Sequence, residues 1–368
     1  MNRNYDYIKE KLNERIKEGL LPGFSIAIIE DGNVVYKTIN NYKEDSIFRL
    51  ASMTKPITAC ATLKASELGL INIEDEITKY LDGFNHMKIG ENKDKKIELK
   101  SYAKKNITIK DILRHESGLG SGPLGDYQVS NRKAPLTLKD AVDEYMNWYL
   151  DFEPETKSIY SPIVAMDILC YIIEITSKMS YFDFLRKYIL EPLEMVDTTY
   201  SLNDNQRKRL VMMYRMNNGK MELDNNFTYE GFFGQNPGFP GGCAGLFSTL
   251  NDYTNLALML SNKGVFKGKR IIEEESIIKM SSDIIPLPKE GIDKYYNWGY
   301  SVFVRGEKAS FQPLNKGTFG WSGAYSPHFF IDLSDNSGLV FMTNLDNDGG
   351  AGSPNIKILE EAYSKIKY

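Results

Sequence analysis

Two residues of this sequence, a serine and a lysine one helical turn apart, are suited to covalent chemistry. Ser52 and Lys55 lie in the stretch 48–56, FRLASMTKP, where a strand or loop ends and a helical pattern opens. Residues three apart share one face of a helix, so the lysine nitrogen can reach the serine hydroxyl. A lysine held neutral by burial could take the serine proton, and free N–H groups at the helix start would stabilise an oxyanion. The alternative is an N-cap serine followed by a solvated lysine.

Two other segments carry groups that would complete a site of this kind. Tyr160 lies in a turn before a helical stretch, from which its phenol could approach Ser52 and Lys55. A tyrosine that simply packs at the turn is the commoner arrangement. The stretch 320–324, GWSGA, lies on or just after a strand pattern. A strand placed beside Ser52 would offer a backbone N–H as a second donor to the oxyanion.

The composition is that of an ordinary soluble globular protein. The chain has 368 residues, 42% hydrophobic and 26% charged, with a net charge of −4. This length suffices for two domains or for one large domain with an inserted lobe. Nothing in the charge favours nucleic acid or an anionic membrane as a partner, and no apolar run is long enough for a membrane span. The charged amino-terminal segment lacks a signal-peptide pattern, which predicts a cytoplasmic protein; a removed leader would leave the same sequence.

The cysteines and histidines give no pattern of a disulfide scaffold or a metal site. Three widely spaced cysteines occur, Cys60, Cys170 and Cys243. Their odd number and spacing exclude a CxxC site, and the first two are expected to be small core residues. The three histidines, His86, His115 and His328, form no metal-binding pair. We therefore expect no metal or other cofactor, and we interpret His115 as a structural residue near a helix end.

Strand patterns occur at both ends of the chain and helical patterns between them. The strand patterns are 24–29, 34–39, 299–305, 318–321, 328–332 and 338–344. The helical patterns include 141–150, 163–177, 181–190, 252–260 and 354–366. The simplest packing closes both ends into one sheet flanked by helices, an α/β (α+β) class, with an inserted helical lobe. The predicted domains are a discontinuous sheet domain, 1–79 and 265–368, and a mainly helical domain, 80–264.

Two segments between these elements lie outside the helix and strand patterns. Residues 88–105 are rich in lysine and poor in apolar residues, which indicates a solvated surface segment. Residues 229–242 are rich in glycine and aromatic residues, and such loops often line a site. Within this loop, Phe232, Phe233 and Phe239 would add apolar wall to the site if the loop folds over it.

Together these features resemble the serine β-lactamase and penicillin-binding-protein-like family, which includes class C β-lactamases and the esterases and D-aminopeptidases on that fold. Besides the Ser52, Tyr160 and Trp321 segments, the resemblance rests on PGF at 22–24, LRHESGL at 113–119, EPLEM at 191–195 and GGCAGLFST at 241–249. It covers nearly the whole chain. It implies a β-lactamase/transpeptidase-like fold, with an antiparallel sheet built from both chain ends and an inserted all-helical lobe.

The resemblance also implies roles for individual residues. Ser52 matches the nucleophile, Lys55 its activating partner, and Tyr160 a general base or proton shuttle that acts as a coupled pair with the lysine. The N–H groups of Ser52 and Ala324 match the oxyanion hole. The third motif, Trp321, Ser322 and Gly323, is implied to bind the substrate.

Two departures from the family pattern concern substrate choice. The second motif often ends in an asparagine that contacts a substrate amide, but this sequence has Pro162 there. The third motif often begins with a cation, but this sequence has Trp321, as the esterase branch tolerates. A carboxylate buried against such a wall would need another partner, and Arg305 and Lys316 are the nearest cations in sequence.

We therefore expect a serine hydrolase that forms an acyl-enzyme on Ser52 and acts on a small ester, amide or peptide. A carboxylesterase or a D-amino-acid peptide or amide hydrolase, with weak or no β-lactamase activity, fits best. A true class C-like β-lactamase or penicillin-binding protein is one alternative, and a non-catalytic ligand-binding relative is another. The oligomeric state stays open.

Ser322 is a second candidate nucleophile. Residues 320–324 loosely resemble a nucleophile elbow centred on Ser322. The following residues lead into another strand pattern rather than a helix, and His328 is only six residues further on. These two features favour Ser52 over Ser322.

Overall fold

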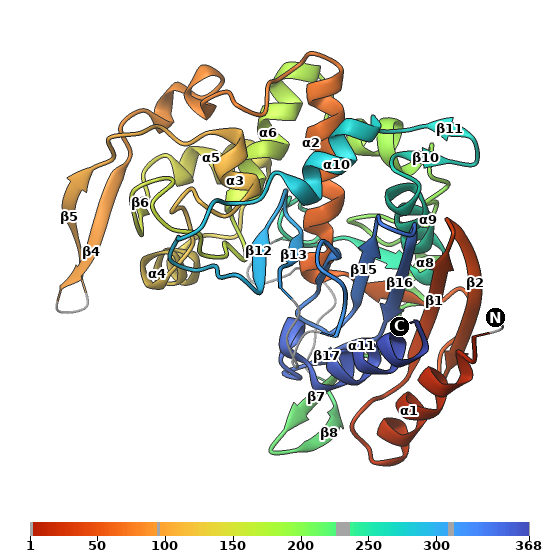
Figure 1. The fold of residues 1–368 in the computed structure, drawn as a ribbon. Coiled ribbons are helices and arrows are strands. Elements are labelled where there is room, and N and C mark those ends of the chain that lie inside the picture. Colours follow the sequence, from red (N-terminus) through yellow and green to blue (C-terminus); the bar gives the residue numbers. More distant parts are fainter. Residues whose placement is uncertain (1–2, 94–95, 226–235, 308–312, 368) are drawn as a thin grey trace.

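A large antiparallel sheet drawn from both chain ends is the central feature of the structure. The structure is a computed structural model that describes residues 3–93, 96–225, 236–307 and 313–367. In this part of the chain, seven strands pair in the order β12-β13-β14-β15-β16-β1-β2 (Figure 1). Their bounds are β1 Phe24–Glu30, β2 Asn33–Asn40, β12 Tyr296–Trp298, β13 Phe303–Arg305, β14 Phe319–Ser322, β15 His328–Asp332 and β16 Ser337–Met342. The predicted sheet is confirmed.

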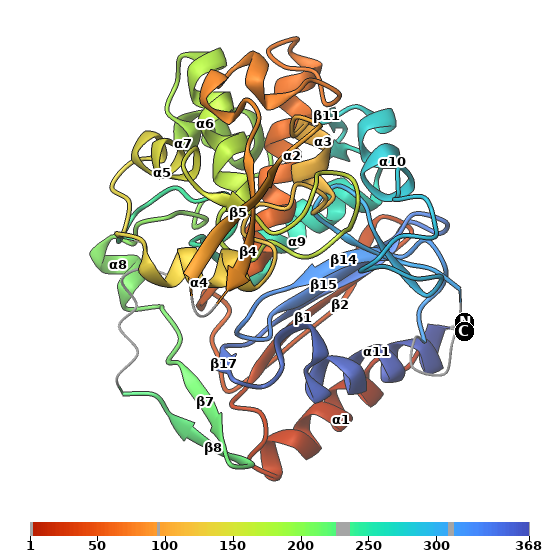
Figure 2. The same ribbon diagram turned by 90° about the vertical axis from the view of Figure 1, so that its left-hand side faces the viewer.

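The sheet is covered on both faces, and β1 shows why its sequence is almost wholly apolar. Ile26 and Ile28 point into a cluster with side chains of α1 (Asp6–Lys17) and α11 (Pro354–Lys367). Ala27 and Ile29, one residue along, belong to the main core, to which α9 (Leu250–Ser261) contributes. Because strand side chains alternate between faces, a strand covered on both sides is apolar throughout. Figure 2 shows α1 and α11 side by side on one face of the sheet.

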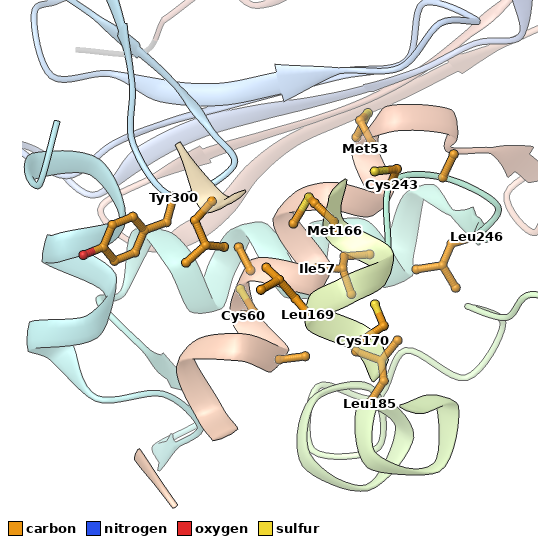
Figure 3. Packing of buried hydrophobic residues seen from close by; sticks show 14 of the residues in the cluster. Met53, Ile57, Cys60, Met166, Leu169, Cys170, Leu185, Cys243, Leu246 and Tyr300 are labelled. Atoms are coloured by element: carbon orange, nitrogen blue, oxygen red, sulfur yellow. The ribbon is translucent and has the colours of Figure 1, made fainter. Parts of the chain in front are cut away.

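The helix after Ser52 is a buried core helix. A 3-10 turn, Ala51–Met53, leads into α2, Thr54–Glu67. The α-helix therefore begins two residues later than predicted, and Ser52 lies in the turn. Eleven of the fourteen residues of α2 are buried, as expected for a helix surrounded by other elements. In Figure 3, Ile57 and Cys60 of α2 lie beside Met166 and Cys170 of α6, Ala165–Ser177. Cys60 and Cys170 are fully buried, which confirms them as core residues.

Shorter helices and strands complete the fold. The remaining helices are α3 Ile109–Leu113, α4 Pro123–Asn131, α5 Leu138–Tyr145, α7 Tyr181–Leu185, α8 Asp204–Arg207 and α10 Glu274–Ser282. The remaining strands are β3 Ile47–Arg49, β4 Lys88–Lys93, β5 Lys96–Tyr102, β6 Tyr149–Leu150, β7 Tyr214–Asn217, β8 Lys220–Leu223, β9 Phe247–Thr249, β10 Val265–Phe266, β11 Lys269–Arg270 and β17 Leu345–Asp346. The predicted helical lobe thus also contains strands.

Three local predictions differ from the structure. The lysine-rich segment 88–105 is exposed, as expected, but it forms the β4–β5 hairpin that projects from the body in Figure 1. The helix predicted over 141–150 ends early, since α5 stops at Tyr145 and β6 pairs with β4. The strand predicted over 299–305 is confirmed only as β13 at its end, because residues 299–302 form the turn between β12 and β13, in which Ser301 has a φ of 56°. Each difference involves pairing or turn geometry that a local pattern does not reveal.

The division into two domains stays a prediction. One hydrophobic cluster contains side chains of both proposed domains, such as Val340 of the sheet and Leu169 of α6. No helix in the described ranges is long and apolar enough to cross a membrane. The cytoplasmic location also stays a prediction.

Candidate active site

A cavity of about 1080 Å³ opens beside the carboxyl end of β14. The predicted site residues that line it are Ser52, Tyr160, Trp321, Ser322, Gly323 and Ala324. Lys55 is fully buried behind Ser52. Segments more than a hundred residues apart in the sequence are therefore brought to one cavity, which we call the cleft.

Lys55 is held by oxygen atoms on three sides. Its Nζ lies 3.4 Å from Ser52 Oγ, 2.7 Å from the Pro162 carbonyl oxygen and 3.0 Å from the Cys243 carbonyl oxygen. A lysine ammonium has three N–H donors, so these three acceptors satisfy it. Burying a charged ammonium without such partners would cost several kcal/mol. The lysine is therefore fixed with one donor directed at the serine.

The turn that carries Ser52 is held in an uncommon backbone conformation. Ala51 has a φ of 45°, in the left-handed region that residues with a Cβ rarely adopt. Strand β3 leads into this turn and pairs with β9, and the N–H of Leu50 donates to the carbonyl oxygen of Leu246 at 3.0 Å. The motif 241–249 therefore supports the site twice, through β9 and through the Cys243 carbonyl. Such strain persists where the surroundings enforce it, and it is concentrated at functional sites.

The glycine of the third motif allows strand β14 to approach this turn. A Cβ on Gly323 would lie 2.3 Å from the Leu50 carbonyl oxygen, closer than any side chain permits. Glycine at this position therefore brings the backbone of 323–324 against the turn that holds Ser52. The close approach gives a physical reason for glycine in the Trp-x-Gly pattern.

Tyr160 belongs to an aromatic cluster at the cleft. Its ring stacks on Trp298, with centroids 5.6 Å apart and planes 6° apart, and lies 5.1 Å from the Trp321 ring. Trp321 Nε1 donates to Tyr160 Oη at 3.4 Å. Lys55 Nζ lies 4.8 Å from the centre of the Tyr160 ring, within the range of a cation–π contact. The structure thus brings Tyr160 to Lys55, but with the ring face, rather than the hydroxyl, toward the ammonium.

His115 fixes the backbone next to Tyr160. Its Nδ1 accepts a hydrogen bond from the N–H of Ser161 at 3.2 Å, and its ring contacts Tyr160 and Trp298 edge-on. Burial, together with the charge of Lys55, lowers the pKa of His115 well below 6.5. The neutral ring is the form that can accept from Ser161. This contact agrees with the structural role expected for His115.

Asp167 supports the loop behind Lys55. Its carboxylate accepts from the N–H of Gly242 at 2.8 Å and from the hydroxyl of Tyr145 at 3.0 Å. Burial raises the pKa of Asp167 to about 6, against the opposing charge of Arg132. Because Gly242 precedes Cys243, the hydrogen bond from Gly242 to Asp167 helps to position the Cys243 carbonyl oxygen, which accepts a hydrogen bond from Lys55. Sequence reasoning missed Asp167, which is one of many acids on helical stretches.

The cleft wall includes several aromatic rings and one predicted cation. Tyr296, Trp298 and Phe303, on β12 and β13, line it, and the sequence analysis did not single them out. Arg305 also lines the cleft, whereas Lys316 is not among the lining residues. The guanidinium of Arg305 is paired with Glu360 at 2.5 Å.

One residue predicted to line the cleft lies elsewhere. Phe239 is buried in the main core rather than in the cleft wall, so that prediction is wrong. Burial in the core removes more of its apolar surface from water than a place on an open cleft wall would. Phe232 and Phe233 lie outside the described residues.

Ser322 contacts a histidine across the sheet. Its Oγ lies 2.8 Å from His328 Nδ1, because Ser322 and His328 face each other in the antiparallel pair β14–β15. Six residues of separation are therefore enough for contact across a tight connection. As expected, the chain after Ser322 enters a strand and not a helix.

An antiparallel sheet from both chain ends, with a helical layer and a serine–lysine pair at their junction, defines a protein of the serine β-lactamase and transpeptidase class. The chain belongs to the β-lactamase family of hydrolases, since the model of that family, described as Beta-lactamase, matches residues 8–363. The predicted family is confirmed.

Individual relatives are distant but span the chain. Protein Rv1367c of Mycobacterium tuberculosis is 24% identical over 394 residues, covering 99% of this chain and 97% of that protein. Esterase EstB of Burkholderia gladioli is 23% identical over 387 residues, covering 96% of this chain and 93% of that protein. The solved structure of EstCE1, a hydrolase with promiscuous acyltransferase activity, has a TM-score of 0.79 at 20% identity, covering 98% and 97%. These likenesses confirm the fold class.

Proposed function

We propose that this protein is a serine hydrolase of the carboxylesterase type, which acts on small neutral esters through an acyl-enzyme on Ser52. The observation that carries the proposal is the contact between Ser52, at the cleft wall, and the fully buried Lys55, whose Nζ lies 3.4 Å from Ser52 Oγ. A serine with a buried lysine at hydrogen-bond distance has the elements of an activated nucleophile.

The chemistry follows from these positions. Ser52 Oγ attacks the ester carbonyl while its proton passes to the Lys55 and Tyr160 pair, in which Lys55 acts as a neutral amine after it has released one proton to solvent. The tetrahedral oxyanion is stabilised by the N–H groups of Ser52 and Ala324. The alcohol leaves with a proton from the same pair, and water then attacks the acyl-enzyme by the reverse proton path. Lys55 and Tyr160 are treated as one unit, because Lys55 contacts both Ser52 and the Tyr160 ring.

The cleft wall supports a neutral substrate. Trp321, Trp298 and Phe303 present apolar rings, and Arg305 is already paired with Glu360. A substrate carboxylate would find no unpaired cation among the described lining residues and would lose its hydration. EstB is named an esterase and EstCE1 a hydrolase, which agrees with this substrate class. Pro162, in place of an amide side chain, further argues against efficient turnover of β-lactams.

A side-by-side turnover screen tests the proposal. We expect kcat/KM for p-nitrophenyl valerate to exceed that for nitrocefin by at least about hundredfold, or about 2.7 kcal/mol of transition-state stabilisation. D-alanyl-p-nitroanilide in the same screen tests the amide alternative. Nitrocefin turnover equal to ester turnover would contradict the substrate class. Absence of turnover, with binding of all three compounds retained, would favour a non-catalytic relative.

A further inference from the structure

A chain of buried polar groups runs from the cleft into the protein behind Ser322. Ser322 Oγ contacts His328 Nδ1 at 2.8 Å, and His328 Nε2 lies 3.2 Å from Glu360 Oε1. The second contact is a close electrostatic one rather than an aligned hydrogen bond. The same oxygen of Glu360 accepts a hydrogen bond from Arg305 Nη2 at 2.5 Å. Ser322, His328 and Glu360 are each 5% exposed. The groups come from β14, β15, α11 and β13, so the tertiary fold builds this chain.

Glu360 is the charged end of the chain. Burial alone would raise the pKa of its carboxyl, but the contact with His328 and the charge of Arg305 outweigh burial and lower it. Glu360 is therefore a carboxylate at neutral pH. A carboxylate oxygen carries only lone pairs, so it favours a proton on whichever imidazole nitrogen faces it.

The position of that proton determines the role of Ser322. In a neutral His328 whose hydrogen is on Nε2, the nitrogen that faces the carboxylate, Nδ1 has a lone pair. The hydroxyl of Ser322 must then donate to Nδ1, because two lone pairs at 2.8 Å would repel each other. With its hydrogen directed at His328, Ser322 presents only oxygen lone pairs to the cleft.

We propose that His328, oriented by Glu360, makes Ser322 a hydrogen-bond acceptor toward the cleft and thereby selects against substrates that carry a carboxylate. The inference rests on the proposed esterase function and specifies its substrate class. Substrates with a hydroxyl or amine near the ester can donate to Ser322. Substrates with a carboxylate at that place meet lone pairs instead of a donor, and are disfavoured. His328 is a positioning residue in this scheme, since it acts through Ser322.

The test compares two substrates that differ only in one charged group. Mono-p-nitrophenyl glutarate and p-nitrophenyl valerate have acyl chains of equal length, and only the first carries a carboxylate. His328→Phe keeps a ring in place, leaves the Arg305–Glu360 pair intact, and frees the Ser322 hydroxyl to donate to the cleft. We expect the ratio of glutarate to valerate kcat/KM to rise about tenfold, as for a hydrogen bond gained to a charged group.

A double variant shows whether the gain passes through Ser322. In His328→Phe combined with Ser322→Ala the hydroxyl is absent, so we expect no rise in the ratio over Ser322→Ala alone. Thr318→Val is the matched control. Thr318 lines the small cavity of about 80 Å³ that His328 also lines, and its buried hydroxyl has no hydrogen-bond partner in the described part of the chain. Removing that hydroxyl should leave the ratio unchanged.

Ser322→Ala alone keeps the inference testable if His328→Phe does not fold. An accepting Ser322 gives nothing to a carboxylate, so its removal should change glutarate and valerate turnover in proportion. A tenfold fall in the ratio would overturn the inference, as would an unchanged ratio in folded His328→Phe. In either case Ser52→Ala would still abolish ester turnover. Turnover retained in Ser52→Ala would instead refute the proposed function itself.

Discussion

Two serines at one cleft differ in what surrounds them. Ser322 Oγ lies 2.8 Å from a histidine nitrogen, and Ser52 Oγ lies 3.4 Å from a lysine nitrogen. By distance alone, Ser322 has the better base. Ser322, however, ends a strand within the sheet, whereas Ser52 lies in a short turn after a residue with left-handed backbone. The backbone of 323–324 packs against the turn of Ser52.

The comparison teaches that a nearby base does not by itself make a nucleophile. Attack also requires donors placed where the oxyanion develops, and these donors stabilise the transition state more than the ground state. We assign that arrangement to Ser52, beside the Gly323 backbone. For Ser322, the same kind of base contact sets the direction of a hydrogen bond. The predictions below test this contrast.

The largest expected effect separates the two serines directly. Ser52→Ala should lower kcat/KM for p-nitrophenyl valerate by more than about thousandfold, as when the nucleophile of a serine hydrolase is removed. Ser322→Ala should cost about tenfold or less, because only a substrate contact is lost. Steady-state kinetics of the two variants, with thermal melts to confirm folding, measure both effects. Equal losses would remove the contrast between the serines.

The second prediction concerns the base of Ser52. Lys55→Met and Tyr160→Phe should each cost about hundredfold or more in kcat, as expected for a general base. The double variant should cost little more than either single variant, because the two residues act as one unit. Lys64→Met, on the same helix and half-buried beside Glu67, is the control and should leave kcat unchanged. A Tyr160→Phe enzyme with a normal rate would remove Tyr160 from the mechanism.

The third prediction concerns the apolar rings of the cleft wall. Trp321→Lys should raise kcat/KM for nitrocefin relative to p-nitrophenyl valerate by about tenfold, since a cation would then meet the carboxylate of the β-lactam. Trp321→Met has a similar chain length without the charge and serves as the control. The same gain in both variants would show that space, not charge, limits the reaction.

The smallest effect concerns stability and pH. Because the pKa of native His115 is lowered well below 6.5, the unfolded chain binds a proton below that pH which the native protein does not. Stability should therefore fall as pH decreases below 6.5, with His115 contributing up to about 1.4 kcal/mol per pH unit. His115→Asn, which tolerates the φ of 59° at this position, should make the dependence on pH shallower.

The control for this prediction is a second histidine with similar backbone. His86 has a φ of 51° but is exposed. Urea titrations between pH 5 and 7 measure the free energy of unfolding across the ordinary histidine range. In these titrations His86→Asn should leave the slope of that free energy against pH as it is in the wild type. If His115→Asn did not alter the slope of the unfolding free energy against pH, His115 would be protonated as readily in the native protein as in the unfolded chain.

Much of the sheet could be predicted because the hydrophobic pattern of neighbouring residues indicates its strands. The apolar runs of β1 and β16 and the Ser52–Lys55 spacing all depend on residues close in sequence. The contact between Ser322 and His328 could not be predicted, because it depends on the register of β14 and β15. Strand register is determined by the whole sheet and the turn, and a slip of one residue would turn the side chains to the other face.

The cleft wall was also beyond local reasoning. Phe303 falls inside the predicted strand 299–305 and Trp298 precedes it, and the turn at Ser301 places both rings at the cleft. The roles of Ser52, Lys55 and Tyr160 stay predictions that kinetics must test. Their meeting at one place came from the family resemblance rather than from the periodicity of the sequence.

The most direct test of the nucleophile is the position of a trapped adduct. A fluorophosphonate reacts covalently with an activated serine, and tryptic cleavage separates the two candidates, since Ser52 lies in peptide 50–64 and Ser322 in peptide 317–357. Mass spectrometry of the digest should find the phosphonyl group on Ser52, and Ser52→Ala should remain unlabelled. An adduct on Ser322 in the wild-type protein would contradict the assignment of Ser52 as the nucleophile.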